Sequence, residues 1–136
     1  VLFPVHPRTR KGLVAQWGDG WKTALSDKNI DAREPAGYLQ ILEWLKEVDE
    51  VWTDSGGLQK EAFFMKRPAL VLRKSTEWKE LIEGGFAALC AESTELRTAH
   101  SALMQSAAKA DYEQPIYGDG RAAHHMVNSL IQWLNH

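Results

Sequence analysis

Short apolar segments alternate with longer amphipathic ones along this chain, and that alternation restricts its possible folds more than any other feature. The short segments have the composition of buried β-strands, and the long ones repeat apolar residues at helical spacing. Strands are predicted at Val1–His6, Ile30–Glu34, Glu50–Thr53, Ala69–Arg73 and Ala87–Ala91. Helices are predicted at about Pro7–Gln16, Ala36–Lys46, Gly57–Met65, Thr76–Gly84, Thr94–Ala108 and Asp119–Asn135. The stretch from Trp17 to Asn29 is predicted to be irregular, with room for a short helical turn.

A strand–helix–strand rhythm with buried strands predicts a parallel sheet covered by helices on both faces. The expected fold is α/β, a three-layer doubly wound parallel sheet of about five strands, Rossmann-like or flavodoxin-like. Ligands bind such sheets beyond the carboxyl ends of the strands. Polar and charged groups follow several of the predicted strands, so a site is expected at that edge.

The size and charge of the chain exclude several classes of partner. A length of 136 residues fits one domain, 1–136, with an ordinary core. The 16 basic and 18 acidic residues nearly balance, so neither nucleic acid nor a membrane surface is an expected partner. No apolar run approaches the span of a bilayer, and no signal peptide is visible. The single cysteine, Cys90, fits a reducing cytoplasm.

The segment Asp54-Ser55-Gly56-Gly57 joins a predicted buried strand to a predicted helix. Its two glycines place bare amides at a helix N-terminus, where unpaired N–H groups and the helix dipole favour an anion. Ser55 adds a hydroxyl, and a phosphate is the natural ligand. The competing interpretation is that Asp54 or Ser55 only caps the helix, and for this motif taken alone capping is preferred.

Two further segments place charged groups at the same edge. Basic residues follow the first predicted strand, namely His6, Arg8, Arg10 and Lys11. They can face an anionic ligand or form a solvated helix turn, and cations at a helix N-terminus are electrostatically misplaced, which favours a function. Arg73 ends the fourth predicted strand, and Thr76 precedes Glu77 as an ordinary N-cap would.

Other conspicuous residues are interpreted as structural. His124 and His125 are adjacent on a predicted helix, so they point to different sides and make a poor metal pair. The six tryptophans are scattered without a stacking stripe, which is typical of core packing. No metal and no cofactor is expected, and no residue of this chain, Cys90 included, is assigned a catalytic role.

The order of these blocks is more specific than any one of them. The segments FPVHPRTRK, EPAGYLQIL, VWTDSGGLQKEA, RPALVLRKSTEWKEL and PIYGDGRAA closely resemble the non-hydrolysing UDP-N-acetylglucosamine 2-epimerase family, from Phe3 to about Ala123. The resemblance covers only the later part of such an enzyme, the UDP-binding second domain of a two-domain, GT-B-type protein. It implies an isomerase of nucleotide sugars used in cell-surface polysaccharide synthesis.

In that family the second domain holds UDP, and the matching motifs imply roles for particular residues. The diphosphate would be bound by Ser55, Gly56 and Gly57, and the ribose hydroxyls by Glu61. His6 and Arg8 would lie beside the phosphates. Pro35 and Tyr38 would border the uracil, and Arg73, Thr76 and Glu77 would lie at the sugar–phosphate side.

The family reaction interconverts UDP-N-acetylglucosamine and UDP-N-acetylmannosamine by eliminating UDP and adding it back after protonation on the other face. The resemblance implies that this chain lacks the first domain, with the carboxylates that move the C2 proton, and the first strand and helix of the second. Alone, the chain is predicted not to epimerise. Loss of that central strand from a 3-2-1-4-5-6 order leaves the flavodoxin-like order 2-1-3-4-5. Val1–His6 is therefore predicted to pair beside Glu50–Thr53.

Trp78-Lys79 replaces the Arg-Pro of many members, and LQKEA with TEW is more like the branch acting on diacetamido-uronic UDP-sugars, or archaeal relatives. A 2-epimerase for a sugar such as UDP-2,3-diacetamido-glucuronate is therefore an alternative. A module that binds UDP or a UDP-sugar without chemistry, a truncated scaffold, and a GT-B glycosyltransferase are others. The HPRT and DSGGLQKEA blocks favour the epimerase. Whether the chain forms a homodimer is also left open.

Overall fold

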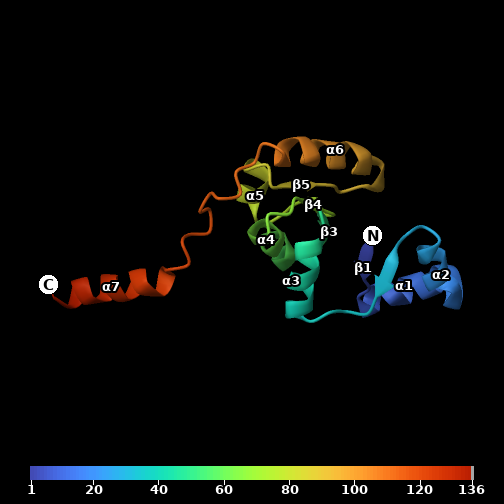
Figure 1. Ribbon diagram of the computed structural model, residues 1–136, viewed down its shortest axis with the longest axis horizontal. Coiled ribbons are helices and arrows are strands. Elements are labelled where there is room, and N and C mark those ends of the chain that lie inside the picture. Colours follow the sequence, from blue (N-terminus) through green and yellow to red (C-terminus); the bar gives the residue numbers. More distant parts are fainter. Residues whose placement is uncertain (136) are drawn as a thin grey trace. The chain divides into compact units, whose positions relative to one another are not determined.

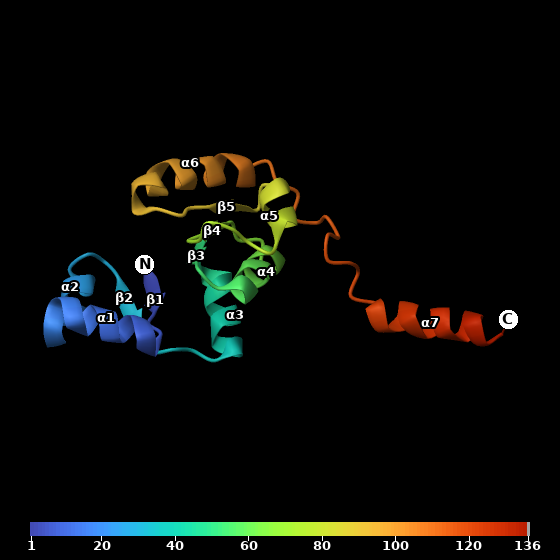
Figure 2. The same ribbon diagram turned by 180° about the vertical axis from the view of Figure 1, so that it is seen from behind.

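The protein, described by a computed structural model over residues 1–135, divides into two compact units, Val1–Glu47 and a second that begins at Val48. Strands and helices alternate in both units, and all strand pairs are parallel (Figures 1 and 2). The predicted α/β class is therefore confirmed. The prediction of one domain, 1–136, stays a prediction, and its last residue lies outside the described part.

The first unit contains a two-stranded parallel sheet with its connecting helices. Its elements are β1 (Leu2–Pro4), α1 (Pro7–Trp17), a 3-10 turn (Gly18–Gly20), α2 (Trp21–Ser26), β2 (Asp31–Arg33) and α3 (Tyr38–Glu47). In the sheet, Leu2 is opposite Asp31 and Pro4 is opposite Arg33. Val5, Trp21 and Leu25 form the buried core, so this small sheet is held mainly by packing against α2.

Helix α2 lies in the stretch that the sequence predicted to be irregular. Trp21 and Leu25 are one helical turn apart, so they share a face, and both are about 5% exposed. The reversal before this helix depends on Gly18, whose φ of 60° is a left-handed value that favours glycine. Burial of two large side chains stabilises a helix that is too short to be recognised by its apolar repeat.

The second unit contains a three-stranded parallel sheet. Its elements are β3 (Val51–Thr53), α4 (Gly56–Phe64), β4 (Ala69–Val71), α5 (Lys79–Glu83), β5 (Ala87–Leu89), a 3-10 turn (Ser93–Glu95), α6 (Leu96–Ala107) and α7 (Ala122–Leu134). The strand order is β3-β4-β5, and every residue of the central strand β4 is buried. This agrees with the continuous apolar character of a strand covered on both faces.

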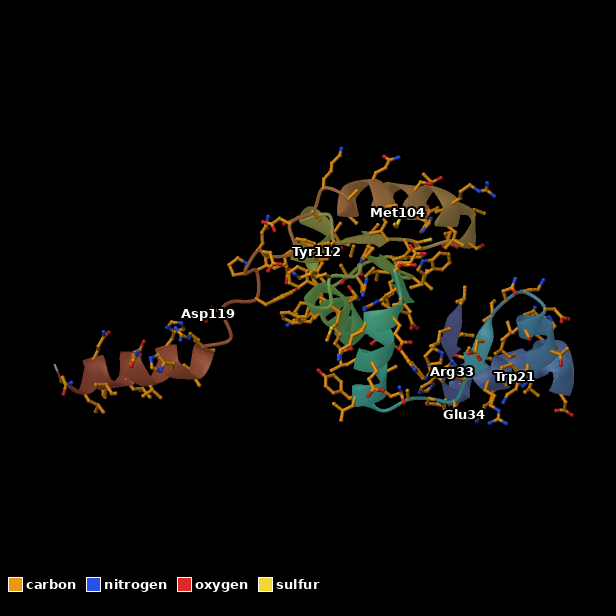
Figure 3. All side chains as sticks on the ribbon, in the orientation of Figure 1. Trp21, Arg33, Glu34, Met104, Tyr112 and Asp119 are labelled. Atoms are coloured by element: carbon orange, nitrogen blue, oxygen red, sulfur yellow. The ribbon has the colours of Figure 1, made fainter. Side chains whose placement is uncertain are left out.

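Helices cover both faces of this sheet. Helix α6 lies on one face, where Leu103 packs with Leu70 and Cys90, and α4 lies on the other (Figures 1 and 2). On the α4 side, the ring of Phe63 contacts Phe86 at 4.8 Å between centroids. Tyr112, labelled in Figure 3, joins this aromatic cluster 4.9 Å from Phe86. Packing on both faces of the sheet therefore fixes the positions of the carboxyl end of β3 and the start of α4.

The two sheets are each described within their own unit. In the described residues, β1 pairs with β2 in the first unit, and β3 pairs with β4 in the second. The predicted pairing of Val1–His6 with Glu50–Thr53 would join the two units, and it stays a prediction.

Helix α7 begins at Ala122, three residues after the predicted start. The carboxylate of Asp119 accepts a 2.9 Å hydrogen bond from the backbone N–H of Arg121 and lies 3.3 Å from a ring nitrogen of His125. These contacts, the backbone bond first, lower the pKa of Asp119. Among residues 1–135, none of the helices combines the length and the apolar composition that crossing a bilayer requires.

Candidate functional site

The junction between β3 and α4 presents its backbone to solvent. The hydroxyl of Thr53 accepts a 2.9 Å hydrogen bond from the N–H of Ser55, which turns the chain at the end of the strand. Ser55 has extended backbone angles, φ −82° and ψ 131°, and the helix begins at Gly56. Ser55 stands at the N-cap position, but its hydroxyl makes no capping hydrogen bond. Capping by this side chain therefore does not explain the motif.

The first turn of α4 is bare. Within the described chain, the amide N–H groups of Gly56 and Gly57 have no hydrogen-bond partner. A methyl group built on Gly57 would meet nothing within 4 Å, so the space before this amide is open. Unpaired N–H groups at the positive end of a helix dipole attract an anion. This turn can accept a phosphate without any rearrangement of α4.

The segment between β4 and α5 brings a cation to the same place. The guanidinium of Arg73 lies 3.1 Å from the carboxylate of Glu77. A methyl group built on Gly56 would overlap that carboxylate and would lie 3.9 Å from the Arg73 guanidinium. Gly56 is therefore a site of close approach, whereas Gly57 faces open space. Glu77 is thus an anion beside both Arg73 and the start of α4.

A chain of hydrogen bonds joins the two segments. The hydroxyl of Thr76 donates to Gln59 at 2.6 Å, and the Gln59 amide donates to the Ser55 carbonyl at 3.2 Å. The indole of Trp78 donates to the Gly56 carbonyl at 2.9 Å. Gln59 is not among the residues predicted for the site, and Trp78 was predicted only to pack in the core. The available signal was the spacing of Gln59, which is one turn after Ser55.

Helix α5 begins at Lys79, later than the predicted Thr76. Thr76 does not cap it: its hydroxyl accepts from the Trp78 N–H at 3.1 Å and is directed toward Gln59. The ammonium of Lys60 lies 4.3 Å from the ring centroids of both Trp78 and Tyr117. Burial, with the neighbouring Glu80 carboxylate, raises the pKa of Tyr117 above its usual range. These contacts hold Trp78 beside the first turn of α4.

Glu61 is one helical turn after Gly57, so both residues share a face of α4. It is partly buried, and its carboxylate makes no hydrogen bond or ion pair within residues 1–135. It is therefore a carboxylate available to hydroxyl donors near the open turn.

The remaining predicted site residues belong to the first unit. His6 is the N-cap of α1, where its Nδ1 accepts a 3.2 Å hydrogen bond from the Arg8 N–H. The proton of the neutral imidazole is therefore on Nε2. The exposed Arg8 side chain makes no ion pair in the described chain. In contrast, Glu34, labelled in Figure 3, lies 4.0 Å from Arg10 and 3.7 Å from Lys22.

An open depression of about 520 Å³ lies in the first unit. It is lined by Val5, Pro7, Arg10, Lys11, Val14, Ala15, Glu34 and Pro35. Pro35 is thus beside basic side chains, whereas Tyr38, at the start of α3, is outside the depression and 62% exposed. His6 and Arg8 also lie outside its lining.

The structure therefore gathers part of the predicted site in one unit. Ser55, Gly56, Gly57, Arg73, Thr76 and Glu77 lie together at the carboxyl end of the β3-β4 pair, with Glu61 one turn along α4. His6, Arg8, Pro35 and Tyr38 lie in the other unit. Their assignment to a ligand stays a prediction.

The fold and this turn define a class: an α/β protein with a helix N-terminus open to an anion at the carboxyl edge of a parallel sheet. Comparison with known proteins makes this more specific. The sequence pattern described as UDP-N-acetylglucosamine 2-epimerase matches residues 1–131. The chain belongs to the UDP-N-acetylglucosamine 2-epimerase family.

Curated relatives come from several organisms. A UDP-N-acetylglucosamine 2-epimerase of Methanocaldococcus jannaschii is 33% identical over 130 residues, which is 96% of this chain and 34% of the relative. The UDP-2,3-diacetamido-2,3-dideoxy-D-glucuronate 2-epimerase of Pseudomonas aeruginosa is 33% identical over 132 residues, 97% of this chain and 35% of the relative. The chain thus spans about a third of the length of these proteins.

Solved structures give the same result. The Methanocaldococcus jannaschii UDP-GlcNAc 2-epimerase in complex with UDP-GlcNAc and UDP has a TM-score of 0.73 and 31% identity, and the match covers 96% of this chain and 35% of that one. The UDP-GlcNAc 2-epimerase from Neisseria meningitidis bound to UDP-GlcNAc has a TM-score of 0.62 and 26% identity, and the match covers 96% of this chain and 36% of that one. The chain therefore has the fold of one domain of a GT-B-type enzyme, as the sequence predicted.

Proposed function

We propose that this chain is the UDP-binding domain of a UDP-sugar 2-epimerase and that it holds the diphosphate at the first turn of α4. The observation that carries the proposal is the bare turn at Gly56 and Gly57, which is open at Gly57 and flanked by Arg73. Family membership gives this anion site a ligand class, because solved relatives are described as complexes with UDP-GlcNAc or UDP. UDP or a UDP-N-acetyl-sugar is the proposed partner.

The roles of the residues follow from their chemistry. The amides of Gly56 and Gly57 and the hydroxyl of Ser55 donate to phosphate oxygens, and Arg73 supplies charge. Glu61 accepts from the ribose hydroxyls. Thr76 and Glu77 lie at the sugar–phosphate side. His6, Arg8, Pro35 and Tyr38 belong to the other unit, and their predicted roles beside the phosphates and the uracil rest on the family motifs alone.

In the proposed reaction, UDP-N-acetylglucosamine and UDP-N-acetylmannosamine interconvert by elimination and re-addition of UDP. This chain binds UDP, the leaving group, and the acid and base that act at C2 are not among its assigned residues. The chain alone is therefore proposed to be inactive, and a cytoplasmic location suits its single cysteine. A second candidate substrate is a UDP-diacetamido-uronate, because a relative named for that sugar is 33% identical over nearly the whole chain.

The first test is calorimetric titration of this chain with UDP, UMP and uridine. UDP is expected to bind more tightly than UMP, because a second phosphate can also pair with the Arg73 guanidinium. Gly57→Asp places a carboxylate before the bare amides and is expected to abolish UDP binding. Gly20→Asp is the matched control, because it adds the same charge at another glycine with open space.

If the Gly57→Asp variant still binds UDP, the proposed diphosphate site at the first turn of α4 is refuted. Absence of UDP binding by the unaltered chain would refute the proposed function. For activity, the chain is incubated with UDP-GlcNAc in D2O and the C2 position is followed by NMR. No deuterium is expected there, and its incorporation would show that the chain alone carries the acid–base groups.

A further inference from the structure

Gln59 is a polar side chain with no access to solvent. Its exposed fraction is 0%, and it lies in α4 one turn after Ser55. A buried amide is costly unless its hydrogen bonds are made, so its presence in this position needs a reason. Both ends of the Gln59 amide are in use, toward Ser55 and toward Thr76.

The direction of each hydrogen bond in the series Ser55–Gln59–Thr76–Trp78 is fixed by which groups can donate. The Ser55 carbonyl can only accept, so the Gln59 Nε2 group faces it and Gln59 Oε1 faces Thr76. The backbone N–H of Trp78 can only donate, and it donates to the Thr76 hydroxyl. The single proton of that hydroxyl must therefore point to Gln59. The Thr76 proton can therefore reach a phosphate oxygen only if its hydrogen bond to Gln59 is lost.

We infer that Gln59 is a positioning residue for the diphosphate seat and that Thr76 serves it as a link rather than as a phosphate donor. Gln59 fixes the position of Ser55 by donating a hydrogen bond to the Ser55 carbonyl. Through its hydrogen bond with Thr76, it also fixes the segment that carries Arg73 and Glu77. This inference rests on the proposed function, since it concerns the same seat. It differs from that proposal in assigning Thr76 to Gln59 and not to the ligand.

A purely structural role for Gln59 predicts something else. Loss of a satisfied core amide would then lower the melting temperature and weaken every ligand in proportion. A positioning role predicts a loss confined to the part of the ligand that meets the first turn of α4. The ratio of UDP affinity to uridine affinity separates the two, because uridine has no phosphate.

The experiment measures both affinities by 15N chemical-shift titration, with a melting curve for each variant. Thr76→Val removes the hydroxyl at nearly constant shape, Thr76→Ser keeps it, and Gln59→Met removes the amide at similar length. Thr98→Val, an exposed position on α6, is the matched control. The Val and Met variants are expected to lose about tenfold in UDP affinity, with uridine affinity unchanged and Thr76→Ser within about twofold of the parent.

Several outcomes would overturn the inference. Full UDP affinity in Thr76→Val would show that the link does not position the seat. Loss in Thr76→Val with full affinity in Gln59→Met would show that the hydroxyl meets the phosphate directly. Parallel loss of UDP and uridine affinity with a lower melting temperature would leave only a structural role. If the parent chain binds no UDP, the proposed function itself fails and this inference with it.

Discussion

Gly57→Ala should stabilise the folded chain and weaken its binding of UDP. Gly57 is in the first turn of α4, has no left-handed φ, and has nothing within 4 Å of the position that a methyl group would take. Alanine is favoured over glycine in helices by up to about 1 kcal/mol, and at a first-turn position we take about 0.5 kcal/mol. For a chain of this size, that raises the melting temperature by about 2 °C.

The same methyl group should weaken UDP binding. A Cα–Cβ bond in a helix tilts toward the N-terminus, so the methyl group projects into the space where the phosphate is proposed to lie. It keeps a phosphate oxygen away from the amide. A charge-assisted hydrogen bond is worth about 1.5–3 kcal/mol, which corresponds to about a 10- to 150-fold loss in affinity. Scanning calorimetry measures the first effect and isothermal titration the second.

Gly56→Ala is the matched comparison. There the methyl group overlaps the Glu77 carboxylate, which must leave Arg73. That pair is partly exposed and contributes at most about 1 kcal/mol, so the helix gain and the lost pair nearly cancel. A lower melting temperature for Gly57→Ala would show that the space is filled. A higher melting temperature with unchanged UDP affinity would refute the assignment of the diphosphate to this turn.

Three further predictions follow from other contacts. Glu77→Gln removes the anion that competes for Arg73, so UDP affinity should rise about threefold in titration with little change in melting temperature; a fall would assign Glu77 to UDP itself. Tyr117 has a raised pKa in the folded chain, so the unfolded chain ionises first and stability present below pH 10 is lost above it. Tyr117→Phe should make that loss shallower in urea unfolding between about pH 9 and 11, and equal slopes would contradict this. Leu103→Ala should lower the unfolding free energy by about 2–5 kcal/mol, because Leu103 is fully buried against Leu70; a loss below about 1 kcal/mol would show that the site collapses.

The strands could be predicted from the sequence because burial on both faces leaves a short, continuous apolar run. Ala69–Val71 is such a run, and the predicted segment there contains the observed strand. Pairing between strands is a different matter, since it depends on contacts far apart in the chain. The predicted pairing of β1 with β3 therefore stays a prediction, although both strands exist. Helix α2 was expected only as a short helical turn within an irregular stretch, because only two of its side chains are buried, which is too few for a recognisable repeat.

The junction of a strand, two glycines and a helix could be predicted, and the contacts that support it could not. A strand followed by two glycines and a helix is a local pattern, and the structure has β3, Gly56 and Gly57 in that order. Gln59 lies within the helix and has the sequence character of a surface residue. It is buried only because the segment around Thr76 folds over it. Such burial is a tertiary effect that no single window of sequence contains.

The described contacts also indicate why two phosphates should be preferred to one. The Thr76 proton is directed to Gln59, and both N–H groups of Trp78 are used within the protein. The free donors of the turn are therefore neutral: the Ser55 hydroxyl and the amides of Gly56 and Gly57. One phosphate on these amides leaves the charge of Arg73 unused, and that guanidinium lies 3.9 Å from the methyl position on Gly56. A second, adjacent phosphate can take Arg73 from Glu77, so we infer that the affinity for UDP exceeds that for UMP chiefly through this exchange of ion-pair partners.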